Sequence, residues 1–351
     1  MTPISPTLAA VLISLTTAGT ACAQGRAVDC VTRADAAERL ACYDHLHGRT
    51  EEPRADAPRL TPTDSPKPAK ADAADAAPPT GRLSSRLAVR WDLDGEQGAL
   101  FTPRAYRPVY LLPVTWTDHV NRRPTSPAPD HSATADLDLR AAETKYQLSL
   151  KAKLGQDLLG TSISLWGGYT QSSRWQVFNG SASRPFRETN YEPELLLVMP
   201  LKGELLGWRM RMASLSLNHQ SNGRTLPLSR SWNRVIAALA MERGEWVIEA
   251  SPWTRIGEGS SDDNPDIENH IGRAELTLNR YWGDHALSLG MRHSLRGGDR
   301  SRGSAQLEWM FPLDGALHGY LQVFSGYGES LIDYNLRQTK LGLGVTIAGW
   351  R

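Results

Sequence analysis

Residues 341–348, "LGLGVTIA", alternate between two kinds of side chain. Large aliphatic residues occupy the odd positions, and Gly, Thr and Ala occupy the even ones. Successive side chains of an extended strand point to opposite faces. The segment therefore predicts a strand with one apolar face and one face of small or polar groups.

Segments of this kind recur along the chain, each of about ten residues, with Gly, Asn, Asp and Pro between them. Their even number predicts an all-β fold, a twelve-stranded antiparallel transmembrane β-barrel, because only a closed sheet leaves no unpaired edge in lipid. A soluble sandwich or lipocalin-like barrel is the alternative, and its apolar faces would instead pack a core. The candidate strands are 107–116, 144–154, 161–171, 193–201, 206–220, 231–242, 245–254, 271–282, 284–294, 304–312, 316–325 and 338–350.

The composition excludes several other classes of protein. The chain has 39 Lys and Arg against 38 Asp and Glu, and no basic run interleaved with aromatics, so nucleic-acid binding has little support. No apolar run is long enough for a transmembrane helix. Aromatic residues near strand ends predict interfacial girdles, namely Trp208, Trp232, Trp246, Trp282, Tyr320 and Trp350.

The N-terminus predicts export. Residues 1–23 read as a signal peptide, since "LAAVLISLTTAG" is a short apolar core and Ala21-Cys22-Ala23 is a small-x-small cleavage site. Cys22 also raises the alternative of a lipoprotein, but Gly19 stands where an aliphatic residue is usual. The favoured reading is a cleaved signal.

Three further regions follow the signal. Residues 24–48 predict a small periplasmic helical element in which Cys30 and Cys42 form a disulfide or remain two free thiols. Residues 49–81, rich in Pro and Ala with no aromatic, predict a disordered linker. Residues 82–351 form the predicted barrel domain.

One strand changes the parity of its apolar face. In residues 208–221, "WRMRMASLSLNHQS", the apolar positions are even up to Met212 and odd from Ala213 onward. A β-bulge produces such a slip. Beyond it, His219 and Ser221 share the face of the preceding leucines, so we expect both to point toward the bilayer.

The next strand repeats the arrangement, since Asn233 shares its parity with Val235 and Leu239. Polar groups that face lipid indicate function. Ser, His and Asn together suit acyl transfer by a nucleophile, a base and a group that orients the base. No G-x-S-x-G elbow is present, which argues against an α/β-hydrolase. The alternative is a loop over 218–232 in which these residues are incidental.

Long motifs carry a resemblance to a known family. "NHQSNGR", "SRSWNR", "RPFRETNYEPELLL", "SSDDNPDI" and "SGYGESLIDYN" resemble outer membrane phospholipase A, in order over roughly residues 145 to 350. The resemblance implies an outer membrane barrel with its active site on the outer wall. It also implies A1, A2 and lysophospholipase activity on phospholipid acyl esters, with activation by homodimerisation.

The resemblance assigns roles to residues of this chain. Ser221 matches the nucleophile, with its backbone amide in the oxyanion hole, His219 the general base, and Asn233 the residue that orients the histidine. The implied cofactor is Ca²⁺ at the dimer interface. Oxygens of Arg224 and Ser229 in one chain and Ser183 in the other would hold it, with waters completing the shell.

Residues 225–228, "TLPL", depart from what a second cation would need. Leu226 and Leu228 stand where an acidic residue would help to hold a second cation, so we expect the interface site alone. Asp262 and Asp263 can supply oxygens, but a solvated acidic loop is the favoured interpretation.

Structural roles are the favoured interpretation for the other polar residues. Glu188, Glu192 and Glu194 near Arg187 could form a glycosidase-like carboxylate pair, yet a hydrogen-bonded network in the lumen is the favoured interpretation. The histidines without spaced metal partners are read as lumen, interface or loop residues: His285, His293 and His318. The rival functions are a passive pore or structural barrel, and a catalytically inactive dimerising relative.

Overall fold

The computed structural model describes residues 30, 33–46, 85–94, 99–315 and 317–348. The chain divides into two units, Met1–Pro78 and Pro79–Arg351. The predicted signal peptide (1–23) and the predicted linker (49–81) lie outside the described residues. Within the described part, no helix is both long and apolar enough to cross a membrane.

The first unit contains helix α2 (Ala36–Leu46). The Asp35 carboxylate accepts hydrogen bonds from the backbone N–H groups of Ala37 (2.9 Å) and Glu38 (3.0 Å), which caps the first turn. Cys30 and Cys42 are joined by a disulfide, with their Cα atoms 5.6 Å apart. The disulfide was the favoured of the two alternatives for these cysteines.

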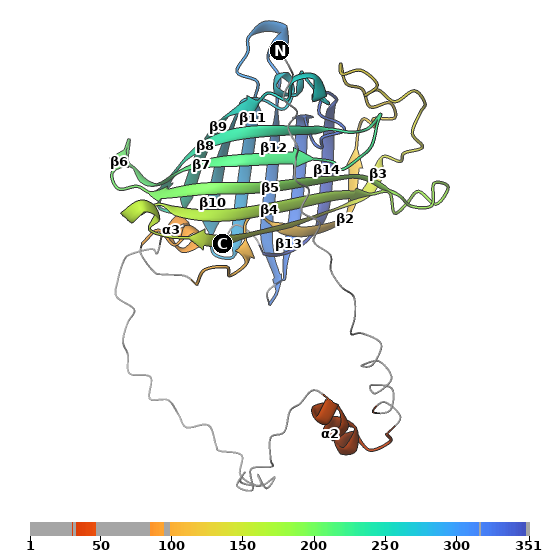
Figure 1. Ribbon diagram of the computed structural model, residues 1–351. Coiled ribbons are helices and arrows are strands. Elements are labelled where there is room, and N and C mark those ends of the chain that lie inside the picture. Colours follow the sequence, from red (N-terminus) through yellow and green to blue (C-terminus); the bar gives the residue numbers. More distant parts are fainter. Residues whose placement is uncertain (1–29, 31–32, 47–84, 95–98, 316, 349–351) are drawn as a thin grey trace, which may run out of the picture. The chain divides into compact units, whose positions relative to one another are not determined.

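The second unit is a closed antiparallel β-barrel (Figure 1). Each long strand pairs with its sequence neighbours, and pairing of the last strand with the first closes the ring. Two short strands, β1 (Arg104–Ala105) and β6 (Glu204–Leu205), extend the sheet. The long strands are β2 (Val109–Thr117), β3 (Ala142–Gly155), β4 (Ser164–Trp175), β5 (Phe186–Pro200), β7 (Trp208–Ser221), β8 (Ser231–Arg243), β9 (Trp246–Ile256), β10 (Ala274–Trp282), β11 (His285–His293), β12 (Gly303–Asp314), β13 (Leu317–Tyr327) and β14 (Arg337–Ala348).

These twelve strands confirm the predicted architecture. Strand β5 differs most from the prediction, because it begins at Phe186 and not near residue 193. Its first half carries buried Glu188, Asn190 and Glu192 on the inner face. A strand whose inner face is charged lacks the apolar alternation on which the prediction depends.

The connections differ between the two ends of the barrel. Segments 118–141, 176–185, 222–230, 257–273, 294–302 and 328–336 lie at one end, and the shorter turns lie at the other. The loops contain the 3₁₀ turns η2 (Gly259–Ser261), η3 (Ile267–Asn269) and η4 (Gly298–Arg300), while η1 (Leu158–Gly160) lies in a turn of the opposite end. Outer membrane barrels carry their longer loops on the extracellular side.

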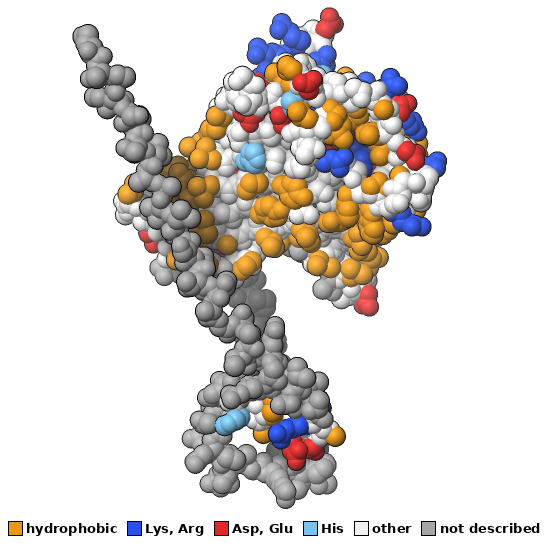
Figure 2. All heavy atoms as spheres, turned by 45° about the vertical axis from the view of Figure 1, so that its right-hand side comes forward, with side chains coloured by type: hydrophobic (Ala, Val, Ile, Leu, Met, Phe, Trp, Pro, Cys, Tyr) orange, Lys and Arg blue, Asp and Glu red, His pale blue; other side chains and the backbone are white. Residues whose placement is uncertain are grey.

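The outer wall is apolar. Leu215, Leu217, Leu343 and Ile347 are 51%, 55%, 58% and 69% exposed. Figure 2 shows hydrophobic side chains over much of the wall, below a rim where Lys, Arg, Asp and Glu gather. Leucines of this exposure in neighbouring strands suit contact with lipid and not with water.

Two predicted girdle residues lie inside the barrel instead. Trp232 and Tyr320 are both fully buried. Trp232 packs edge-on against Trp253, and Tyr320 stacks on Tyr110. The prediction was wrong for these two because an aromatic ring near a strand end fits a barrel interior as well as an interface. Trp350 lies outside the described residues.

The predicted bulge in β7 is present, one residue earlier than expected. The register against β8 shifts between Met210 and Met212, so Arg211 is the extra residue. Arg211 lies near Glu242 inside the barrel (Nε to Oε2, 3.6 Å), and Met212 is buried in the interior. The outward parity therefore begins at Ala213, as predicted, but Met212 does not share the outer face.

Helix α3 (Arg86–Trp91) contributes to the interior at the short-turn end. Its Trp91 packs edge-on against Trp166, with ring centroids 5.4 Å apart, and Lys151 Nζ lies 3.1 Å from the centroid of the Trp91 ring. Glu242 of β8 accepts hydrogen bonds from Ser85 Oγ (2.6 Å) and Leu87 N (2.7 Å). The sequence pattern predicts no element here.

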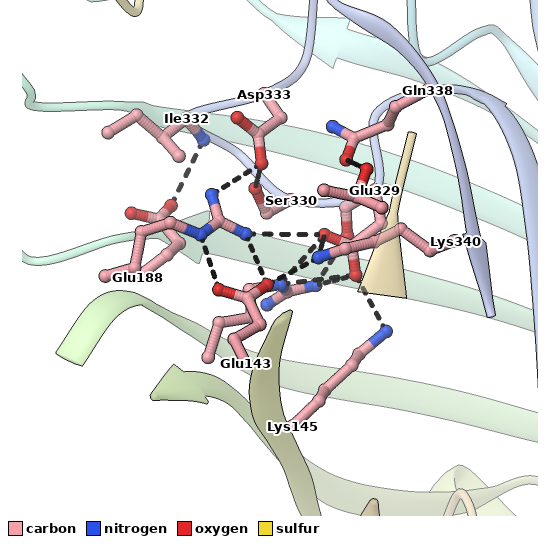
Figure 3. Close-up of polar contacts among 12 residues, drawn as sticks. Glu143, Lys145, Glu188, Glu329, Ser330, Ile332, Asp333, Gln338 and Lys340 are labelled. Carbon is pink, nitrogen blue, oxygen red and sulfur yellow. Dashed lines mark hydrogen bonds and ion pairs between the residues drawn. The ribbon is translucent and has the colours of Figure 1, made fainter. Parts of the chain in front are cut away.

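An ion-pair network fills the interior at the long-loop end (Figure 3). Segment 328–336 folds inward, so that Glu329 is buried at the centre of the network. Its carboxylate lies 2.8 Å from Lys145 Nζ, 3.0 Å from Arg174 Nε and 3.1 Å from Lys340 Nζ. Arg187 then links Glu143 (2.8 Å) to Asp333 (2.7 Å).

The predicted lumen network of glutamates is confirmed. Glu192 pairs with Arg107 (2.9 Å) and Arg234 (3.3 Å). Glu188 accepts a hydrogen bond from the backbone N–H of Ile332 at 3.1 Å, and Glu194 accepts one from Ser216 at 2.7 Å. Every one of these carboxylates is engaged in structural contacts, which disfavours the glycosidase alternative.

Replacing Glu329 with alanine is expected to destabilise the barrel by about 3–5 kcal/mol, because three buried cations lose a common partner. Urea unfolding of the purified protein, followed by the electrophoretic shift between folded and unfolded forms, measures this. Glu245→Ala, at an exposed turn position, is the matched control and should change stability by less than about 0.5 kcal/mol. Equal midpoints for both variants would contradict the central role of Glu329.

Candidate active site

Two of the predicted catalytic residues face each other across neighbouring strands. His219 of β7 and Asn233 of β8 are directly paired in the register, and Ser221 pairs with Ser231. The His219 Nδ1 and Asn233 Oδ1 atoms are 2.8 Å apart. An amide oxygen can only accept, so Nδ1 carries the proton and Nε2 is left as the basic nitrogen. Ser221 follows His219 by two positions on the same face.

These residues lie on the exterior of the barrel. The alternating residues of β7 face inward: Asn218 is 3% exposed, and Gln220 lines the interior cavity and accepts a hydrogen bond from Trp232 Nε1 at 2.8 Å. His219 and Ser221 therefore continue the outer face of Leu217. The alternative of a loop over 218–232 is wrong, because only residues 222–230 leave the sheet.

The loop after Ser221 is closed by a buried asparagine. The Asn222 side-chain oxygen accepts from the backbone N–H groups of Arg224 (3.2 Å) and Arg230 (3.0 Å), and its amide donates to Leu228 O (2.8 Å). Gly223 adopts φ of +60°, and a Cβ there would lie 3.1 Å from the Tyr191 ring. The positive φ and the nearby Tyr191 ring both favour glycine at position 223, in the turn that leads out of β7.

A buried arginine supports the same loop. The Arg230 side chain donates hydrogen bonds to the carbonyls of Ser229 (2.6 Å), Pro227 (3.3 Å) and His131 (2.9 Å). The last contact ties the loop to segment 118–141. The backbone next to the end of β7 that carries Ser221 is thus held from two directions.

Asp262 and Asp263 of loop 257–273 are paired with other side chains and only 16% and 17% exposed, contrary to the favoured interpretation of a solvated acidic loop. Asp263 accepts hydrogen bonds from Ser229 Oγ (2.7 Å) and Ser231 Oγ (3.4 Å), and its other oxygen lies 2.9 Å from His131 Nε2. Asp262 pairs with Arg255 at 2.5 Å. The fold brings partners from other loops to these carboxylates, which sequence spacing could not reveal.

The predicted calcium ligands lie in two loops at the same end of the barrel. Arg224 and Ser229 belong to loop 222–230, and Ser183 to loop 176–185. The hydroxyl of Ser229 adjoins the Asp263 carboxylate, so hard oxygen donors and a negative charge meet there. Among the described residues, no group of three or more His, Cys, Asp or Glu could hold a metal.

One residue at the site was missed by the sequence analysis. Glu258, just beyond β9, accepts a hydrogen bond from Asn233 Nδ2 at 2.5 Å. Its other oxygen lies 3.3 Å from Arg255. Partial burial raises the pKa of the Glu258 carboxyl above its ordinary value, and the Arg255 charge opposes this rise. A lone glutamate between two loop glycines carries no periodic signal that could have revealed it.

The histidines read as structural have structural contacts. His285 stacks on Trp282 and Trp309, with ring centroids 5.3 and 6.0 Å apart. His293 Nε2 lies 3.1 Å from Ser301 Oγ. His318 pairs in register with Thr346 in the wall.

Comparison with known proteins identifies the family. Residues 87–347 match the family model described as phospholipase A1. The chain belongs to this family. The predicted resemblance, the phospholipase class and the outer membrane barrel are thereby confirmed.

Curated relatives and solved structures agree with this assignment. The chain is 35% identical to a putative phospholipase A1 of Neisseria meningitidis, over 91% of this chain and 90% of the relative. It is 40% identical to the phospholipase A1 of Escherichia coli K12, over 70% and 82%. The structure of the Salmonella typhi outer membrane phospholipase dimer with bound calcium is 38% identical, with a TM-score of 0.65, and the match covers 73% of this chain and 96% of that one.

Replacing Arg230 with alanine should loosen loop 222–230 without unfolding the barrel. Cleavage there by thermolysin is expected to rise at least about tenfold, because even one lost hydrogen bond to a charged donor is worth ~1.5 kcal/mol or more. Mass spectrometry of the fragments locates the cut. Arg209→Ala, at an exposed position of β7, serves as the control. An unchanged cleavage rate in the Arg230 variant would refute this role.

Proposed function

We propose that the protein is a calcium-dependent outer membrane phospholipase, active as a homodimer, that hydrolyses acyl esters of phospholipids and lysophospholipids. Ser221, His219 and Asn233 form its catalytic triad. The observation that carries the proposal is the 2.8 Å contact between His219 Nδ1 and Asn233 Oδ1 on the outer wall, on the face that Ser221 shares. Membership of the phospholipase A1 family supports it.

The first step forms an acyl-enzyme. Ser221 Oγ attacks the ester carbonyl carbon while His219 Nε2 takes the hydroxyl proton. Asn233 keeps the Nδ1–H directed away from Ser221, so that the basic nitrogen is the one available for this transfer. The protonated imidazole then gives its proton to the departing alkoxide, and the lysophospholipid leaves as an alcohol.

The second step regenerates the enzyme. A water molecule attacks the acyl-serine carbonyl, and His219 Nε2 accepts its proton. Collapse of the tetrahedral intermediate breaks the acyl–Oγ bond, and the proton returns from His219 to Ser221. The released fatty acid and the lysophospholipid account for all atoms of the ester and the water.

The surroundings favour this reaction over a passive pore. The exposed Leu215 and Leu217 run along the outer wall beside the triad and can contact acyl chains. The interior instead holds a cavity of about 310 Å³ lined by several ion-paired residues, including Arg107, Glu192 and Arg174. Such a filled interior offers no wide aqueous path.

Calcium and a second copy complete the proposed site. Arg224 and Ser229 of one chain and Ser183 of its partner copy would provide backbone and hydroxyl oxygens to the ion. Bound there, calcium would stabilise negative charge that develops on the ester carbonyl oxygen. The proximity of Asp263 to Ser229 supports the fit. A calcium-bound dimer is also the form in which the Salmonella relative was solved.

The N-terminal regions have a separate proposed organisation. Residues 1–23 act as a signal for export, residues 24–48 as a small periplasmic element, and residues 49–81 as the linker to the barrel domain, 82–351. Disulfide-linked Cys30 and Cys42 are compatible with an oxidising compartment outside the cytoplasm.

Replacing Ser221 with alanine should abolish release of fatty acid from mixed phospholipids, a loss of at least about 10³-fold in kcat. The barrel should keep its folded electrophoretic mobility, since the hydroxyl supports no interior contact. Ser325→Ala, another outer-wall serine, on β13, is the matched control. Full hydrolysis by the Ser221 variant would remove this residue from its role.

Removing calcium with a chelator should stop hydrolysis and convert dimers into monomers, as measured by sedimentation in detergent. Ser229→Ala should raise the calcium concentration needed for half-maximal dimerisation by about tenfold or more, because one ligand oxygen is lost. Ser325→Ala again provides the control. Dimers that persist without calcium, or an unshifted titration in Ser229→Ala, would contradict the proposed metal site.

A further inference from the structure

Glu258 stands directly behind the proposed triad. Asn233 uses both ends of its amide: Oδ1 faces His219 Nδ1 at 2.8 Å, and Nδ2 donates to Glu258 Oε1 at 2.5 Å. The second carboxylate oxygen, Oε2, lies 3.3 Å from an Arg255 amino nitrogen. A chain of polar contacts therefore runs from the histidine through the asparagine to an anchored carboxylate.

We propose that Glu258 is a positioning residue of the active site, which fixes the orientation of the Asn233 amide and places a negative charge behind His219. This inference rests on the proposed function, because it assigns Glu258 a part in the same reaction.

The first effect is geometric. An asparagine amide has nearly the same shape after a half-turn, but the turned group would present NH₂ to the His219 Nδ1–H, donor to donor. A carboxylate only accepts hydrogen bonds, so Glu258 fixes the NH₂ end on its own side. Asn233 Oδ1 is thereby held toward the imidazole, in the orientation that leaves Nε2 basic.

The second effect is electrostatic. A neutral asparagine stabilises a protonated imidazole less than a carboxylate would. Glu258 supplies a negative charge behind Asn233, from the loop that follows strand β9. Asn233 pairs in register with Ile256, which is 44% exposed on the outer wall, so the path between the charges runs through an apolar, weakly screening region.

Other charged groups hold Glu258 in place. Arg255, whose side chain is only 8% exposed, bridges Glu258 and Asp262, at 3.3 and 2.5 Å. Arg255 also donates to the backbone carbonyl of the buried Asn264 at 3.2 Å. The carboxylate is thus attached to the end of β9 and to the loop that follows it.

The test compares full-length variants in detergent micelles with calcium and a phospholipid that carries a fluorescent acyl ester. Glu258→Ala should lower kcat by about 10- to 100-fold, the value of a charge-assisted hydrogen bond, with little change in KM. Glu268→Ala, which removes another ion-paired carboxylate of the same loop, is the matched control and should leave kcat unchanged. Folded electrophoretic mobility is measured for every variant.

Two readouts separate positioning from a merely structural role. Glu258→Gln keeps an acceptor but loses the charge, so the acidic limb of its pH–rate profile should move to lower pH. In an Asn233→Ala background, Glu258→Ala should cause a much smaller loss than in the parent, because the geometric effect acts through the Asn233 amide and only the electrostatic effect remains. Effects that multiply in the double variant, or a Glu258→Ala enzyme with the parent's kcat and pH profile, would overturn the proposal.

The parent protein and Ser221→Ala are measured alongside. If the parent hydrolyses lipid and Ser221→Ala does not, Glu258 variants that lack the expected changes in kcat and pH profile overturn this inference alone. If the parent shows no hydrolysis that depends on Ser221, the proposed function and this inference fall together.

Discussion

Closure of the backbone hydrogen-bond ring is the constraint on which the rest of the structure depends. Hydrocarbon offers no partner for a free N–H or C=O group, so every strand needs two neighbours. Pairing of β14 with β2 supplies the last of these. Once the ring is closed, side-chain parity alone decides what meets lipid and what meets the interior. The bulge at Arg211 sets this parity for the end of β7 that carries His219 and Ser221.

A second constraint determines the arrangement of the interior, because charges buried away from bulk water need partners of opposite charge. Segment 328–336 turns inward and brings Glu329 to Lys145, Arg174 and Lys340. The segment overlaps the motif "SGYGESLIDYN", none of whose residues belongs to the proposed triad. The network also links β3, β4 and β14 to one another inside the barrel.

Alternation was enough to predict the strands and the outward direction of His219, Ser221 and Asn233, because these depend on a local period of two. Alternation could not predict features that do not depend on a period of two. Trp232 and Tyr320 suit an interior as well as an interface, and only the fold distinguishes the two. Short α3 has too few residues for a periodic signal. Contacts between loops, such as Asp263 with Ser229 or Glu258 with Asn233, join residues whose separation follows no rule of spacing.

The placement of the proposed triad on two adjacent wall strands has a consequence for how the enzyme would meet its substrate. Backbone pairing between β7 and β8 sets the separation of His219 and Asn233, so no cleft has to form around them. A lipid reaches such a surface by lateral diffusion within its own leaflet. In the proposed mechanism, the quantity that governs turnover is therefore the mole fraction of phospholipid in the surrounding membrane, and not a concentration in water.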